Sequence, residues 1–566
     1  MTEAIRHTLR DSKAARWTAL LIVSFTMFAG YYMADVLAPL QGLLENKLGW
    51  SSAEYGIVTS AYGWFNVFLG FLILGGIILD KMGVRFTGLS SAAVMVAGAA
   101  IKYWAVSTHS LDGVNWHVLF WDAKAQVMIA ALGYAIFGVG VEVAGITVSK
   151  IIVKWFKGHE MALAMGLQIS IARLGTALAI STSLPVAYRF NVSTPILFCL
   201  IMLCIGFLAF IMYTFNDKKL DASVAADNEK HNVEAEEEFR ISDIFNIIGN
   251  KGWWYIAILC VLFYSAVFPF LKYATSLMVN KFGVNEVWAG IIPSLLPFGT
   301  ILLTPLFGGI YDKKGKGATI MIIGALLIIF VHAMFSIPFL NNYLIAILLV
   351  LILGVGFSLV PSAMWPSVPK IIPHRQLGTA YSLIFWVQNW GLMGVPLLIG
   401  WVVNKFCFVG YVALLGTGFT TQHGDMITKA VIGGKVIEIN KPSMVMRDDS
   451  TFTIQSFVYK NQLEIQSIIT TGKDTIAKSL IPDNKFKSIN TFSLPIFSIE
   501  KKKVDAFITE KGEKVSKYTR VSSYYNYTIP MMIFTSFGLL ALIFAFLLKA
   551  EDKKKGYGLE SPNVVN

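Results

Sequence analysis

Charged residues are scarce in this chain. Only 14% of its 566 residues are Asp, Glu, Lys or Arg, whereas 55% are hydrophobic. A soluble domain carries about 25% charged residues, so this composition excludes an ordinary soluble protein and predicts a membrane protein with several spans. A net charge of +12 would suggest nucleic acid in a soluble chain, but basic residues also gather at the cytoplasmic ends of membrane helices. We therefore expect a lipid bilayer as a partner and no nucleic acid.

Cysteines and catalytic motifs are also few or missing. The four cysteines, Cys199, Cys204, Cys260 and Cys407, all lie in or beside apolar stretches, which excludes a disulfide framework. The chain has no Gly-x-x-x-x-Gly-Lys-Ser/Thr phosphate loop, no His-Glu-x-x-His zinc motif and no Gly-x-Ser-x-Gly elbow. These absences argue against an enzyme, an ATP-driven pump and a protein with a bound metal or other cofactor.

Long apolar stretches dominate what is present. About 20 apolar residues cross a bilayer. On that basis the sequence contains twelve spans, at 17–40, 53–79, 85–107, 123–150, 159–187, 194–215, 253–279, 286–311, 317–338, 343–368, 376–404 and 526–548. We therefore predict an all-α membrane protein with twelve transmembrane helices. Lys and Arg are concentrated on the side of the N-terminal tail, so both termini are expected to be cytoplasmic.

Two polar segments divide the spans. Residues 216–252 are predicted to be a cytoplasmic linker between an N-terminal six-helix bundle (1–215) and helices 7–11 of a C-terminal bundle (253–409). Residues 410–524 contain the alternating stretches "KVIEIN", "TFTIQSFVY" and "LEIQSIITT", which are typical of strands. We therefore predict a small β-rich insert on the extracytoplasmic side, followed by helix 12 and a cytoplasmic tail (525–566).

The two bundles repeat one another weakly, as two six-helix pseudo-repeats. "GIILDKMGVR" (76–85) follows the second span and "GGIYDKKGKG" (308–317) follows the eighth, and in each a glycine precedes Asp80 or Asp312 by four residues. Glycine lets helices approach closely, and an aspartate can accept hydrogen bonds from the positive N-terminus of a neighbouring helix. We therefore predict a gating role for Asp80, Arg85 and Asp312; the alternative is ordinary solvated loop charges.

Two opposite charges stand out inside the spans. Glu142 lies 15 residues before Lys157, near the predicted turn, and Arg173 lies 16 residues after it. At 1.5 Å per residue both are roughly 23 Å from the turn, near mid-membrane. Intramembrane charges usually face a bundle interior or an aqueous cavity. The planar fork of arginine suits a carboxylate and a glutamate suits an ammonium group, so the pair predicts a zwitterionic substrate, with a structural ion pair as the alternative.

Other residues in the spans are weaker candidates for the same binding site. Asp35 and Lys272 are ionisable, and the alternative for each is a side chain that snorkels to the membrane edge. The remaining candidates are amide and aromatic side chains, for which packing or an interfacial belt is the alternative. They are Tyr62, Trp64, Asn66, Tyr264, Trp365, Trp386, Gln388 and Asn389.

Several stretches resemble a known family. They are "YGWFN" (62–66), "WFKGHEMALAMGLQISIARLG" (155–175), "YSAVFPF" (264–270), "MWPSV" (364–368) and "QNWGL" (388–392). These stretches are similar to the major facilitator superfamily, in the branch that contains lysosomal dipeptide transporters. Proton-coupled peptide carriers usually bear a Glu-x-x-Glu-Arg-Phe motif in the first span, and its absence here favours uniport or weak coupling. The resemblance implies a dipeptide permease that works by alternating access without an ATPase. It also implies that Glu142 and Arg173 bind the substrate, and it aligns Asp35 with an aspartate of the branch.

The resemblance does not extend across the insert at 410–524. Lysosomal members of the branch instead pair with a separate glycosylated luminal subunit, so we expect the insert to shield or stabilise the same face in cis, or to bind an extracytoplasmic protein. The tails contain no acidic dileucine sorting signal, which favours a bacterial inner membrane over a lysosome. We expect a monomer.

Two other functions remain open at this stage. One is a proton-coupled organic-anion or amino-acid carrier, in which Arg173 binds the anion and Glu142 carries the proton. The other is a membrane sensor or assembly platform that does not transport and that uses residues 410–524 to bind its partner.

Deletion of residues 410–524 tests the role of the insert. If the insert protects the extracytoplasmic face, the deletion is expected to lower both the amount of protein in the membrane and substrate uptake. Immunoblots of membranes and uptake per molecule measure the two effects. Unchanged abundance together with unchanged uptake would contradict this role.

Overall fold

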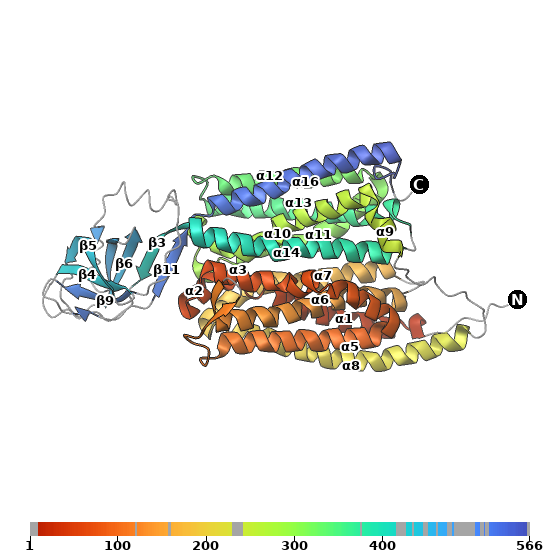
Figure 1. Ribbon diagram of the computed structural model, residues 1–566, viewed down its shortest axis with the longest axis horizontal. Coiled ribbons are helices and arrows are strands. Elements are labelled where there is room, and N and C mark those ends of the chain that lie inside the picture. The colour runs from red at the N-terminus through yellow and green to blue at the C-terminus, as the bar shows by residue number, and fades with distance from the viewer. Residues whose placement is uncertain are drawn as a thin grey trace.

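The structure is a computed structural model in which helices lie side by side along the long axis and a sheet stands at one end (Figure 1). It describes residues 9–118, 121–156, 160–228, 242–373, 376–414, 426–432, 435–444, 451–459, 462–471, 478–479, 504–509, 514–515 and 520–562. The following statements concern these residues.

The first part of the chain, up to residue 228, forms one group of helices, which we call the N-half. Its elements are η1 (Leu9–Asp11), α1 (Lys13–Asp35), η2 (Ala38–Leu40), α2 (Gln41–Leu48), α3 (Ser52–Ser60), η3 (Ala61–Gly63), α4 (Trp64–Phe68), α5 (Phe71–Ser107), α6 (Ala125–Phe156), α7 (Met161–Arg189) and α8 (Thr194–Asn228), with the hairpin β1 (Asn115–Val118) and β2 (Trp121–Lys124) before α6. Ser51 begins α3 with a capping box: its hydroxyl accepts from the Glu54 amide at 3.1 Å, and the Glu54 carboxylate accepts from the Ser51 amide at 2.7 Å.

The second group of helices, which we call the C-half, begins after residue 241. Its elements are α9 (Ser242–Ile248), α10 (Lys251–Phe282), η4 (Glu286–Trp288), α11 (Ile291–Lys314), α12 (Gly317–Ser336), α13 (Tyr343–Ile371), α14 (Leu377–Phe406) and α16 (Thr528–Lys555). Asn250 caps the start of α10 and Asn342 caps the start of α13, each through its side-chain oxygen. The two groups occupy separate layers in Figure 1.

The number of membrane spans agrees with the sequence prediction. Eleven helices in the described residues are long and apolar enough to cross a bilayer, and the total is twelve if the bent pair Ser52–Phe68 and Phe71–Leu79 is one span. The protein is therefore a multi-pass integral membrane protein. Most predicted span edges lie within a few residues of the helix ends, although α8 continues well beyond the predicted end at residue 215.

The second and third spans differ from the prediction. Residues 53–79 were expected to form one helix, but the chain bends by 58° near Gly70, whose φ of 63° is left-handed. The loop expected between residues 79 and 85 is instead part of α5, which is interrupted only at Gly83, with φ 77° and ψ 174°. A glycine is needed there because this backbone region is almost closed to residues that carry a Cβ.

Strands occupy the described residues between α14 and α16. They are β3 (Phe408–Leu414), β4 (Met426–Ile432), β5 (Lys435–Met444), β6 (Thr451–Tyr459), β7 (Gln462–Thr471), β8 (Lys478–Ser479), β9 (Val504–Thr509), β10 (Lys514–Val515) and β11 (Arg520–Tyr525). Their order is β10-β9-β4-β5-β7-β6-β3-β11, with β8 beside β7. The three stretches predicted as strands coincide with β5, β6 and β7. The first and last strands, β3 and β11, pair antiparallel, so this segment leaves and re-enters the helical part at one place.

The two ends of the helical part differ. One end holds the start of α1 and the end of α16, and we call it the terminus end; the other carries the strands, and we call it the sheet end (Figure 1). At the sheet end the halves touch closely, because a Cβ on Gly56 of α3 would lie 2.9 Å from the Gly400 Cα of α14. Two glycines facing each other allow this backbone contact.

Replacing Gly83 with alanine tests the interruption in α5. Alanine must adopt a backbone conformation that costs about 1–3 kcal/mol, so the Gly83→Ala variant is expected to have a lower thermal midpoint in detergent. Gly309→Ala is the matched control, because Gly309 lies in the helical interior of α11 with open space around it. Equal midpoints for the two variants would contradict the backbone conformation of Gly83.

Candidate binding cavity

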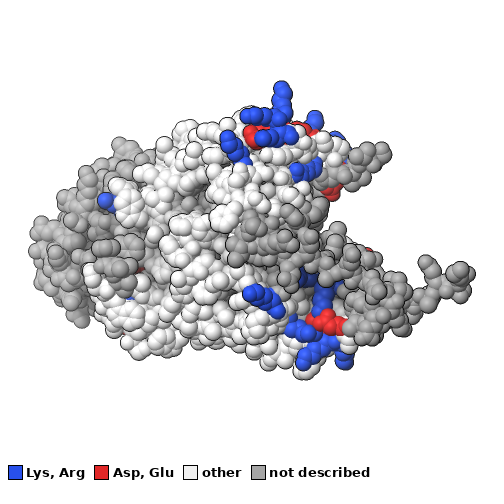
Figure 2. All heavy atoms as spheres, turned by 45° about the vertical axis from the view of Figure 1, so that its right-hand side comes forward, with Lys and Arg blue, Asp and Glu red and all other residues white. Residues whose placement is uncertain are grey.

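A cavity of about 960 Å³ lies between the N-half and the C-half. Its lining extends from Asp35 and Lys272 at the inner end to Ser149 and Pro366, which lie near the terminus ends of α6 and α13. Figure 2 shows the molecule hollowed between its two parts on that side, with Lys and Arg near the hollow. The cavity is therefore open to the terminus end, and the halves close it at the sheet end.

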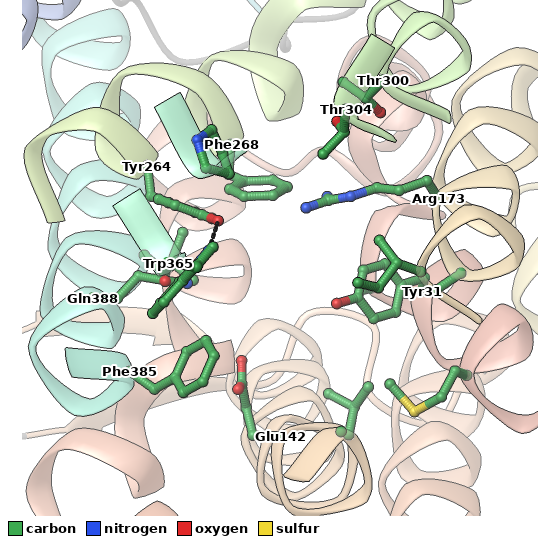
Figure 3. Close-up of a pocket in the computed structure, with 18 of the residues that line it drawn as sticks. Tyr31, Glu142, Arg173, Tyr264, Phe268, Thr300, Thr304, Trp365, Phe385 and Gln388 are labelled. Atoms are coloured by element: carbon green, nitrogen blue, oxygen red, sulfur yellow. Dashed lines mark hydrogen bonds between the residues drawn. The ribbon is translucent and has the colours of Figure 1, made fainter. Parts of the chain in front are cut away.

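Glu142 lines this cavity from α6. The Tyr62 hydroxyl donates a hydrogen bond of 2.7 Å to Glu142 Oε1, and Asn389 of the C-half lies beside the same carboxyl group. Figure 3 shows the carboxyl group directed into the cavity near Phe385. Because a carboxylate has about four acceptor positions, Glu142 can still accept a hydrogen bond from a molecule in the cavity while Tyr62 and Asn389 contact it.

Arg173 enters the cavity from α7. Its guanidinium carbon lies 5.0 Å from the ring centroid of Phe268, 5.3 Å from that of Phe357 and 5.7 Å from that of Tyr31. Aromatic rings attract a cation through their faces and do not accept the full set of guanidinium hydrogen bonds. An anion in the cavity can therefore bind to the N–H groups that the rings leave open, near Thr300 and Thr304 (Figure 3).

Glu142 and Arg173 face the same cavity without pairing with each other. Among the residues that the structure describes, no ion pair joins them, and Figure 3 shows them at different places on the wall. The structural ion pair considered as an alternative is therefore absent from this conformation. Two opposite charges that face one cavity without pairing have the chemistry to bind a ligand that is itself charged at both ends.

Asp35 and Lys272 instead form the ion pair at the inner end. Lys272 Nζ lies 2.6 Å from Asp35 Oδ1 and donates to the Ala34 carbonyl at 2.7 Å, while the Thr176 hydroxyl donates to Asp35 Oδ2 at 2.8 Å. The pair joins α1 of the N-half to α10 of the C-half. Helix α1 ends at Asp35 inside the span, ahead of Pro39, so its free carbonyls attract the lysine.

Four of the proposed site residues do not line the cavity, which corrects their assignment. Of the uncharged candidates, Tyr62, Tyr264, Trp365 and Gln388 line it. The other four bind backbone or side-chain oxygens in the helical packing: Trp64 donates to Ser60 Oγ, Asn66 to the Gly138 carbonyl, Trp386 to the Val67 carbonyl and Asn389 to the Phe385 carbonyl. Asn389 remains relevant through its position beside Glu142.

The predicted gating residues lie at the terminus end. Arg85 binds Asp221 at 2.7 Å and approaches Asp217 at 3.6 Å, and Lys154 contacts the same two aspartates. This cluster lies wholly within the N-half. Asp312 is exposed near the end of α11, and the side chain of Asp80 lies outside the described residues.

Sequence reasoning missed most of an aromatic wall on the C-half. Besides Tyr264 and Trp365, which the sequence had offered as candidates, the wall consists of Phe268, Phe357, Tyr381 and Phe385. Helical spacing could have found part of it, because Phe268 and Lys272 are four residues apart, as are Tyr31 and Asp35 on α1, and such pairs share a helix face. Phe357 and Phe385 gave no comparable signal, since neither has a charged neighbour at helical spacing.

The Major Facilitator Superfamily model matches residues 20–396. Among similar proteins, the lysosomal dipeptide transporter MFSD1 of Danio rerio is 28% identical over 409 residues, which cover 69% of this chain and 81% of that protein. The human lysosomal dipeptide transporter MFSD1 is 25% identical over 403 residues, with 69% and 81% covered.

Solved structures show the same fold. A bacterial homologue of the human lysosomal transporter Spinster, inward-facing and unoccupied, has a TM-score of 0.52 at 13% identity, covering 69% of this chain and 83% of that chain. The nucleoside transporter NupG has a TM-score of 0.52 at 13% identity, covering 69% and 91%. At these identities the likeness concerns the fold alone.

Removing one partner of the Asp35–Lys272 pair tests its contribution to stability. Lys272→Met leaves a buried carboxylate without its cation, which typically costs about 3 kcal/mol or more, so the thermal midpoint is expected to fall. The double variant Asp35→Asn/Lys272→Met removes both charges and is expected to recover most of the loss. A double variant no more stable than Lys272→Met would contradict the pairing.

Proposed function

The chain belongs to the major facilitator superfamily, and from this premise we propose that it is a uniporter that carries dipeptides or other short peptides across a membrane by alternating access. Its relatives are transporters and not enzymes. The observation that carries the proposal is the placement of Glu142 and Arg173 in one cavity without pairing. The dipeptide transporters among its relatives support the same substrate class.

A dipeptide carries one positive and one negative terminal group, which are the opposite charges that Glu142 and Arg173 need as partners. Its terminal ammonium group binds Glu142, and its carboxylate binds the N–H groups of Arg173 that the surrounding rings leave free. An extended dipeptide spans roughly 7 Å, a length that suits two groups on the walls of one cavity. The bound substrate then neutralises the charges of Glu142 and Arg173, and these residues neutralise the charges of the substrate. This pairing lowers the free-energy cost of holding all four charges inside the membrane.

The side chains of the peptide meet the aromatic wall. In the described lining the cations are Arg173 and Lys272, and Lys272 is already paired with Asp35. An acidic side chain therefore finds no further cation, whereas an apolar or aromatic side chain buries surface against Phe268, Phe385 and their neighbours. We infer that the carrier prefers uncharged side chains.

We also propose which side of the membrane each end of the molecule faces. The terminus end carries the basic residues near the cavity mouth (Figure 2) and is assigned to the cytoplasm, so the conformation is inward-facing and the insert (410–524) is extracytoplasmic.

We assign the bundles to 1–215 and to 253–409 with 525–566, as six-helix pseudo-repeats joined by the linker 216–252, in a monomer in a bacterial inner membrane. Asp80, Arg85 and Asp312 are assigned to gating at the terminus end.

Substitutions at the two charged residues test the site. Arg173→Ala and Glu142→Ala are each expected to reduce uptake of a dipeptide such as Ala-Phe into proteoliposomes by at least about a hundredfold, because removing a partner leaves a buried charge unpaired. Arg189→Ala is the matched control, since Arg189 is exposed at the C-terminal end of the same helix. Wild-type uptake by both site variants would refute the proposal.

A second experiment uses dipeptides with one blocked terminus to assign each terminus to its residue, and it measures the thermal shift of the purified protein on binding. In the wild type, N-acetylation and C-amidation of the dipeptide should each abolish the thermal shift that the free dipeptide produces. In Arg173→Ala, amidation should cause no further loss of binding, and in Glu142→Ala the same holds for acetylation. A panel that includes organic anions and amino acids separates a peptide carrier from the anion or amino-acid carrier.

A further inference from the structure

The sheet end is where the halves must separate if the cavity is to open on that side. The Asp35–Lys272 pair joins the halves there at the floor of the cavity, and the Gly56–Gly400 contact joins α3 to α14. One further connection between the halves lies beyond these contacts and involves the segment that leads from β11 into α16. It runs through Tyr525, the last residue of β11.

The segment around Tyr525 is fixed to the C-half. The Tyr525 amide donates to Asn280 Oδ1 of α10 at 2.8 Å, and the Asn526 amide donates to the Cys407 carbonyl at 2.8 Å. The Tyr527 hydroxyl donates to Ser276 Oγ of α10 at 2.7 Å. This segment must therefore move with α10, α14 and α16.

The Tyr525 side chain nevertheless reaches the N-half. Its hydroxyl donates to Glu45 Oε2 of α2 at 3.0 Å. Glu45 is only 3% exposed and is held by its own half, since Ser52 Oγ donates to Glu45 Oε1 at 2.7 Å. Burial raises the pKa of the Tyr525 phenol well above its usual value, so the hydroxyl keeps its proton and remains a donor.

We propose that the Tyr525–Glu45 hydrogen bond is a latch that holds the sheet end closed and makes the insert part of the transport cycle. When the halves separate at the sheet end, the phenol leaves Glu45 and β11 moves with the C-half. The bond exists only in the closed arrangement, so it favours the conformation that is open to the terminus end. The inference rests on the proposed alternating access and not on the identity of the substrate.

The test measures the distance between the halves at the sheet end. Spin labels are attached to Phe190→Cys, after α7 in the N-half, and Tyr343→Cys, at the start of α13 in the C-half; both native residues are exposed, and the native cysteines are replaced. Pulsed electron resonance then reports the distance distribution. Tyr525→Phe, which removes only the hydroxyl, is expected to raise the ratio of long to short distances about tenfold or more, the effect of a hydrogen bond to a carboxylate.

Tyr527→Phe is the matched control. It removes a phenol two residues away whose partner, Ser276, belongs to the same half, so the distance distribution should remain that of the parent. An unchanged distribution in Tyr525→Phe, or an equal shift in Tyr527→Phe, would overturn the latch. If Tyr525→Phe does not fold, Glu45→Gln replaces it and removes the negative charge of the acceptor. The distance distribution should again shift toward long distances, and an unchanged distribution would overturn the latch.

The readout needs no substrate, so its failure and that of the proposed function are distinguishable. If Tyr525→Phe shifts the distances but no dipeptide binds, the latch is supported and the proposal of peptide transport is refuted. If the protein transports dipeptides but the distances are unchanged in Tyr525→Phe, peptide transport is supported and the latch is refuted.

Discussion

The cost of burying charge in a bilayer governs where the ionisable side chains of the spans lie. An unpaired charge in hydrocarbon carries a high free-energy cost. Asp35 of the N-half and Lys272 of the C-half therefore form an ion pair, with 2.6 Å between Oδ1 and Nζ. Glu142 and Arg173 lie on the cavity wall, where a hydroxyl donor and aromatic rings partly stabilise them. This constraint therefore accounts for the positions of these four ionisable side chains, at the cavity wall or in a pair at its inner end.

The same constraint links the cavity to motion. Lys272 binds a carboxylate of the other half, and two of the aromatic rings next to Arg173, those of Phe268 and Phe357, also come from the other half. Moving one half against the other therefore changes the surroundings of both cations at once. A ligand that carries its own opposite charges can compensate for that change, which gives a physical reason for a zwitterion to accompany the movement.

The closed end of the molecule relies on different physics. Two glycines allow α3 and α14 to meet backbone to backbone, and such contacts gain packing energy only at short range. The bond from Tyr525 to Glu45 adds a directional contact just beyond them. A closed end built from short-range contacts loses them together when the halves separate, which favours two discrete conformations over a continuum.

The sequence by itself determined the membrane class, the approximate spans and two charged residues that line the cavity, Glu142 and Arg173, because apolar length and intramembrane charge are local properties. It also located the stretches that coincide with β5, β6 and β7. It did not reveal that Glu142 and Arg173 stay apart while Asp35 pairs with Lys272, since residues 237 positions apart meet only when the helices pack. It also left Trp64, Asn66 and Trp386 undecided, because an aromatic or amide side chain serves packing and binding equally well. Tertiary structure alone decided which faces of the helices line the cavity.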